Sequence, residues 1–224
     1  MSEGVCFKEA NSDVFILFLT DCKFLKCGSK MKISEPDSLT ATKHAAENWD
    51  LATGNVVVGE EGGLTRAYFE LRIDSGRSGN GSSLSNFSIG AVREGLDHDK
   101  EQYTSNSARF LHMFNGSLYG NDKNGSDAHK QGMGSIKVGD RVGVLIDTEG
   151  EGRVLFFKNG QQFGPGFVGG VSGRLVLGVQ MYSQGCQCTL LPDAEEPAEP
   201  FTKWEGYVYA VSYTHLTLPT NDLV

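Results

Sequence analysis

Hydrophobic and polar positions alternate along the central part of the chain. In "RAYFELRI" at 66–73, Ala67, Phe69, Leu71 and Ile73 share one face, while arginine, tyrosine and glutamate occupy the other. A period of two is typical of a strand with one buried face. Similar apolar runs predict further strands at 87–92, 109–114, 141–147, 153–157, 174–182 and 186–191.

Turn signals separate these runs, and no stretch has a convincing helical pattern. The 29 glycines lie mostly between the predicted strands, where turns favour them. The segment nearest to a helix, "TATKHAAENWD" at 40–50, is short and uncapped. The pattern therefore predicts an all-β fold, a two-sheet antiparallel β-sandwich of the jelly-roll kind.

One dipeptide interrupts the strand-like segment "RVLFFKNGQQFGPGF" at 153–167. Asn159-Gly160 is the pair that most readily takes the two positive-φ positions of a type I′ turn. The twist of that turn matches two antiparallel strands, so we expect a tight hairpin at this point.

Composition narrows the classes of partner. The apolar fraction of 39% supports a real core, and 224 residues suffice for one large β domain or two small ones. A net charge of −8 and a pI near 5.1 argue against nucleic-acid binding, which requires a basic face. No apolar run is long enough to span a membrane, and "VFILFL" at 14–19 lacks the features of a signal peptide. We therefore expect a cytoplasmic, monomeric domain without nucleic-acid or membrane partners.

The motifs for catalysis are weak. Residues 164–169 match G-x-G-x-x-G, but Pro165 removes a backbone N–H and a strand-like segment follows where a nucleotide site needs a helix. No Gly-x-Ser-x-Gly nucleophile motif occurs, and the five histidines accompany no catalytic signature. We expect no enzyme activity and no cofactor.

Two motifs raise the question of a metal site. The segment "LDHDKE" starts loosely like a calcium loop at Asp97, but Gln102 and Ala108 stand where an EF-hand needs glycine and glutamate. Four cysteines could supply thiolates to zinc, yet their spacings are atypical, and the odd total of five favours reduced thiols. We expect a solvated acidic loop, buried free thiols and no metal.

The order of the predicted strands resembles the SPRY domain family. The resemblance covers roughly residues 30–192 and is most specific around Gly139-Asp140, Asp147, Phe157 and Asn159-Gly160. One departure is that phenylalanines, Phe110 and Phe114, stand where family members often carry tryptophan before the "GSLYG" segment. The resemblance implies a sandwich that binds proteins, usually short linear peptides, through loops at one rim, without catalysis or a cofactor.

The resemblance also implies which loops form that rim. The expected peptide-binding residues, aromatic or polar and each in a loop, are Trp49, Asp50, Asp97, His98, Tyr103, Tyr182 and Gln184. Aromatic side chains can anchor a peptide, and polar neighbours can fix its register. The alternative is a carbohydrate-binding lectin, because lectin sandwiches share this architecture and Trp49 could stack on a sugar.

The chain divides into four parts. Residues 1–28 are an uncertain N-terminal extension, and residues 29–192 are the sandwich. Residues 193–210 are an acidic, proline-containing linker that begins a further region, and residues 211–224 are a tail. The extension is either an added strand or a mispredicted gene start. The tail begins with "VSYTHLTLPT", which resembles, codon for codon, a translated transposase-type sequencing adapter. We expect the tail to be non-native and without function, and the sandwich to be one domain of a larger protein.

Overall fold

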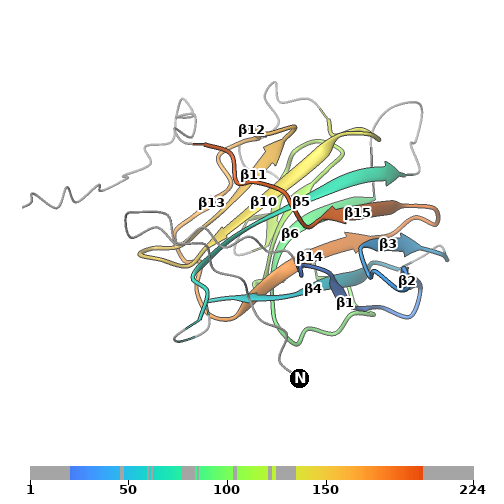
Figure 1. The fold of residues 1–224 in the computed structure, drawn as a ribbon, viewed down its shortest axis with the longest axis horizontal. Coiled ribbons are helices and arrows are strands. Elements are labelled where there is room, and N and C mark those ends of the chain that lie inside the picture. Colours follow the sequence, from blue (N-terminus) through green and yellow to red (C-terminus); the bar gives the residue numbers. More distant parts are fainter. Residues whose placement is uncertain are drawn as a thin grey trace, which may run out of the picture.

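The computed structural model describes residues 21–198, apart from 46–47, 60, 62, 77–83, 85, 103–104, 121–122 and 125–134. Within these residues the chain forms fifteen strands and no helix, arranged as two facing antiparallel sheets (Figure 1). No helix that could cross a membrane occurs in this part of the chain. The predicted tail and the start of the predicted extension lie outside the described residues.

The first sheet contains seven strands. In spatial order they are β1 (Phe24–Cys27), β4 (Asp50–Val58), β14 (Leu175–Met181), β6 (Phe87–Arg93), β7 (Ala108–His112), β8 (Leu118–Gly120) and β9 (Lys123–Asn124). Strands β4, β14 and β6 lie at its centre although they come from distant parts of the chain. This is the non-sequential order typical of a jelly-roll-like sandwich.

The second sheet contains eight strands. Seven follow one another in the order β12 (Gln161–Gln162), β11 (Arg153–Lys158), β10 (Arg141–Asp147), β5 (Arg66–Ser75), β15 (Gln187–Leu191), β3 (Thr40–Lys43) and β2 (Met31–Ile33). Strand β13 (Phe167–Val168) pairs with β11 beside this path. The predicted all-β sandwich is confirmed, and the segment 40–50 forms β3 and the start of β4.

The main core fills the space between the inner faces of the sheets. It takes every second residue of the central strands, including Phe69, Leu71, Ile89, Val144, Phe156 and Leu177. This alternation is the period of two that the sequence displays. Burial of these side chains is the main source of stability, at about 1.5–3 kcal/mol for each large apolar residue.

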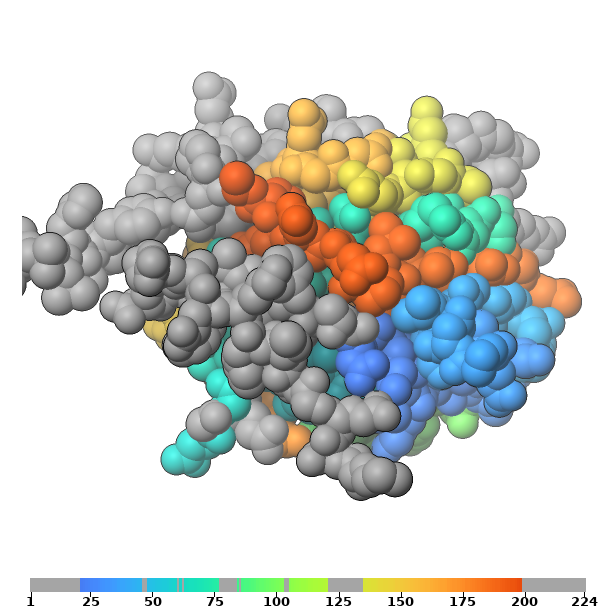
Figure 2. Space-filling view, in the orientation of Figure 1, coloured from blue at the N-terminus to red at the C-terminus, as the bar shows by residue number. Residues whose placement is uncertain are grey.

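The outer faces of both sheets are also partly covered. Leu96, in the loop after β6, packs over an apolar cluster on the first sheet that includes Phe110. On the second sheet Ala194 packs over Tyr68 and Phe157, and the segment after β15 crosses this face (orange to red in Figure 2). Tyr68, on the polar side of the alternating pattern, is therefore buried.

The Asn-Gly hairpin forms as predicted. Asn159 and Gly160 have φ values of 51° and 80°, and Lys158 pairs with Gln161 across the two-residue turn. The Asn159 side chain accepts a hydrogen bond from the backbone N–H of Arg141 at 2.8 Å. The turn therefore fixes the register of β11 and also ties it to the start of β10.

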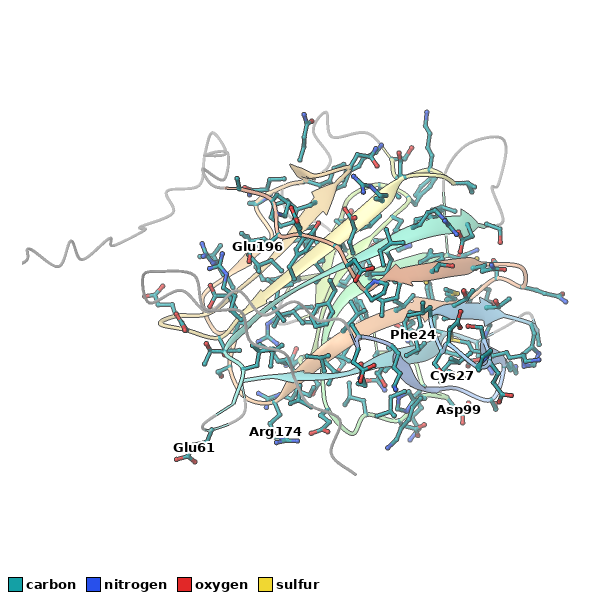
Figure 3. The ribbon with its side chains drawn as sticks, in the orientation of Figure 1. Phe24, Cys27, Glu61, Asp99, Arg174 and Glu196 are labelled. Atoms are coloured by element: carbon teal, nitrogen blue, oxygen red, sulfur yellow. The ribbon has the colours of Figure 1, made fainter. Side chains whose placement is uncertain are left out.

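Strand β1 lies within the segment that the sequence left as an uncertain extension. It pairs with the edge of the first sheet at β4, and Phe24 and Cys22 belong to the main core. Figure 3 shows Phe24 pointing into the protein from this edge. The folded unit therefore includes residues that precede the expected boundary at residue 29.

This arrangement predicts that a fragment starting at residue 29 is less stable than one starting at residue 21. Loss of β1 exposes the pocket filled by Phe24, so we expect the 29–198 fragment to lose roughly 2–4 kcal/mol relative to 21–198. Urea unfolding followed by fluorescence measures the difference. Equal unfolding midpoints would show that β1 contributes nothing to the sandwich.

Candidate functional site

A group of aromatic side chains lies at one rim of the sandwich, where β4 begins and β14 and β7 end. The rings of Trp49 and Tyr182 lie 5.6 Å apart between centroids, and Trp49 also meets the ring of His112 at 6.4 Å. Tyr182 and Trp49 were both expected at the rim, and the structure brings them together. The sequence did not indicate that His112 belongs to this aromatic group.

His112 lies at the centre of this group. Its ring also contacts Phe114 at 6.4 Å and Tyr119 at 5.7 Å, in edge-to-face arrangements that aromatic pairs favour. Phe114 and Tyr182 are exposed, at 45% and 36%. We call Trp49, His112, Phe114, Tyr119 and Tyr182 the aromatic patch.

The turn between β7 and β8 orients half of this patch. Asn115 accepts a hydrogen bond from the backbone N–H of Ser117 at 3.1 Å, and its side-chain oxygen lies 3.3 Å from Nδ1 of His112. Gly116 has a φ of 71° and donates its N–H to the carbonyl of His112. The tight turn thus holds Phe114 outward beside His112.

A buried ion pair supports the other half of the patch. Nζ of Lys43 lies 2.5 Å from Oδ2 of Asp50, and both side chains are almost completely buried. Lys43 also donates to the carbonyl of Asn48 at 3.1 Å, and the N–H of Lys30 donates to Asp50. The sequence placed Asp50 in contact with a ligand, but its carboxylate is instead internal and fixes the segment that carries Trp49.

The turn after β14 attaches to the same place. The N–H of Gly185 donates to the carbonyl of Lys43, and the N–H of Tyr182 donates to the carbonyl of Asn86. Gln184 uses its side-chain amide to bond the carbonyl of His44 at 3.0 Å. Tyr182 therefore projects from a turn that is bonded on both sides.

The acidic loop after β6 runs alongside the start of β4. The carbonyl of His98 accepts the N–H of Leu51, and its Nε2 lies 2.9 Å from Oγ1 of Thr53. Burial, with a further contribution from the charge of Lys26, lowers the pKa of His98. Asp97 is exposed and pairs with Lys100 at 3.1 Å. Tyr103, the remaining expected residue, lies outside the described residues.

Two buried polar atoms lie beside the patch on the outer face of the first sheet. Ser88 pairs with His112 on one side and with Gln180 on the other, so the three side chains share this face. The Nε2 of Gln180 donates to the carbonyl of Lys100, but within the described part of the chain Oε1 of Gln180 and Oγ of Ser88 have no hydrogen-bond partner. Both side chains are completely buried, so they belong to the polar floor beneath the patch and not to its exposed surface.

The other motifs of the sequence have structural roles. Residues 164–169 form a loop that contains the short strand β13, with no helix after it. No disulfide joins the described cysteines, and burial raises the pKa of Cys22 to about 12. Among the described residues no group of three or more histidine, cysteine, aspartate or glutamate side chains converges as metal ligands would.

Comparisons with known proteins agree with this architecture. The family model of the SPRY domain matches residues 66–192. The solved SPRY domain of human HERC1 is 18% identical, with a TM-score of 0.58 over 75% of this chain and 96% of that one. A second human SPRY domain is 20% identical, with a TM-score of 0.55 over 76% and 99% of the two chains. No significant match was found among curated protein sequences.

The buried ion pair generates a stability prediction. In Asp50→Asn the charge of Lys43 loses its counter-ion while it remains buried, so we expect a loss of about 3–5 kcal/mol in unfolding free energy. Chemical denaturation measures this loss. Glu94→Gln, which removes one partner of the exposed Glu94–Arg174 pair, is the control and should cost less than about 1 kcal/mol. Similar losses in both variants would contradict the support role of the buried pair.

Proposed function

The chain belongs to the SPRY domain family, and from this premise we propose that it binds a short linear peptide at the aromatic patch. SPRY domains generally serve as protein-interaction modules and not as enzymes. The observation that carries the proposal is the cluster of Trp49, Tyr182 and Phe114 around His112 at one rim. Exposed aromatic residues on a rigid support are the usual anchors of protein interfaces.

The support of the patch favours recognition of an extended ligand. Trp49 and Tyr182 are held by backbone hydrogen bonds and by the Lys43–Asp50 pair, so little conformational entropy is lost when a ligand binds. We propose an extended peptide with one apolar or aromatic anchor.

The lectin alternative has less support. Asp99 accepts the N–H of Ser29 and Asp97 pairs with Lys100, so two carboxylates of the acidic loop already have protein partners. A glycan array with and without calcium separates the two functions, because calcium-dependent binding to glycans would favour the lectin.

We predict that Trp49→Ala and Tyr182→Ala each weaken peptide binding by about thirtyfold, since anchor residues contribute about 2 kcal/mol or more. A peptide array identifies ligands, and calorimetry with the best of them measures the change. Leu25→Ala is the matched control, because Leu25 is an exposed apolar residue on β1, away from the aromatic patch. Unchanged affinity in both aromatic variants, with Leu25→Ala also unchanged, would reject this site.

A second variant tests the polar floor of the site. Ser88→Ala removes a buried hydroxyl that has no partner, so we expect unchanged or slightly higher thermal stability. The same change should leave the affinity for the peptide unchanged, because the hydroxyl is completely buried beneath the exposed patch. Clearly weaker binding, or a clear loss of stability, would contradict this prediction.

A further inference from the structure

Arg109 is a buried cation that the proposed peptide site does not use. It pairs with Ala91 of β6 and alternates with Phe110, which belongs to the outer cluster, so its side chain lies on the inner face of the first sheet. Only 2% of the residue is exposed. From there its Nη2 donates to the carbonyl of Gly170 at 2.5 Å, in the loop that joins β13 to β14.

The rest of this guanidinium is unsatisfied. Nε and Nη1 of Arg109 are buried and have no hydrogen-bond partner among the residues that the structure describes. These two atoms carry most of the N–H donors of the side chain. A buried charge of this kind is normally paired with an anion, because an unpaired one loses its hydration without compensation.

The neighbouring charge is a second cation. Burial first, and then the positive charge of Arg93, lower the pKa of Arg109, and no carboxylate contributes to the shift. The nearby acid Glu94 is already paired with Arg174 at 2.7 Å. The two arginines therefore make a positive region whose counter-ion is not supplied by the described residues.

Glycines of the loop between β13 and β14 leave room for both arginines. A Cβ placed on Gly173 would lie 3.1 Å from Nη1 of Arg93, so the guanidinium of Arg93 rests against this loop. Gly170 and Gly173 have φ values of 69° and 79°, which side-chain-bearing residues rarely adopt. The same short loop thus touches Arg109 from inside the sandwich and Arg93 from the surface.

We propose that Arg109 and Arg93 form a recessed binding site for a single oxyanion, either a carboxylate or a phosphate group. Guanidinium groups bind both through short, charge-assisted hydrogen bonds. The buried Arg109 would supply the unpaired N–H groups, and the exposed Arg93 would close the site from the solvent side. Arg174 marks this region in Figure 3, well separated from Asp99 beside the aromatic patch.

This site is distinct from the peptide site. Arg109 and His112 belong to one strand but lie on its opposite faces, and Arg93 is at the end of β6 remote from Phe87, where the patch lies. The proposal therefore does not rest on peptide binding. Loss of one activity would leave the other measurable.

The test uses the full chain with inorganic phosphate and, separately, acetate as probes. Nuclear magnetic resonance of the arginine Nε–Hε groups should show a saturable shift of the Arg109 signal with at least one probe. The melting temperature should rise by about 2–4 °C as the site fills. A response to phosphate alone, or to acetate as well, identifies which oxyanion the site accepts, and no response to either overturns the proposal.

Substitutions distinguish an anion-binding role of Arg109 from a purely structural one. Arg93→Gln lies at the surface and should weaken the anion about tenfold or more without affecting folding. Arg109→Met should abolish the response and keep or raise the melting temperature in anion-free buffer, because it removes an unpaired buried charge. A marked fall in melting temperature for Arg109→Met, with Arg93→Gln binding as the wild type does, would assign Arg109 to the scaffold and overturn the proposal.

The matched control is Lys32→Gln, which removes one exposed positive charge on β2. It should leave the phosphate response unchanged. Phosphate also stabilises proteins generally by exclusion from their surface. If the wild type and all three variants gain the same stability, the effect is this general one and the site does not exist.

Discussion

The buried ion pair between Lys43 and Asp50 is the contact on which the rim of this sandwich depends. Lys43 ends β3 in the second sheet and Asp50 begins β4 in the first, so the pair connects the two layers at one end. Gly28 packs so closely here that a Cβ would lie 2.9 Å from the Cβ of Asp50. The burial of two charges is costly, but their additional bonds to Asn48 and Lys30 compensate and impose one geometry.

The same pair explains why the aromatic patch is well supported although it is built from distant segments. Trp49 directly precedes Asp50, and the turn that carries Tyr182 bonds the backbone of Lys43 through Gly185. His112 comes from a third segment and joins them through its ring. Each loop is short and fixed at both ends, as expected of a preorganised binding surface.

Much of the fold could be predicted because its signals are local. The alternation in β5, the apolar runs of β10 and β11 and the turn at Asn159-Gly160 depend only on neighbouring residues. The contact of His112 with Trp49 could not be predicted, because it joins residues that are distant in sequence. The Lys43–Asp50 pair spans only seven residues, but it forms between two different sheets, which the local pattern does not show. The burial of Tyr68 could not be predicted for a related reason. Tyr68 is on the polar side of its strand, but Phe157 and the segment at Ala194 cover it.

Strand β7 shows how the two candidate sites share one scaffold. Its first half departs from a simple sandwich, with the charged Arg109 on the inner face and the aromatic Phe110 on the outer face, while Leu111 belongs to the main core. The outer face can accept Phe110 because Leu96 covers that part of the sheet. Beyond this cover the same face continues to His112 and the aromatic patch, while Arg109 reaches the opposite way to Gly170. Because β7 is paired on both sides, with β6 and with β8, its position is fixed, and it presents an aromatic surface on one face and a cation on the other.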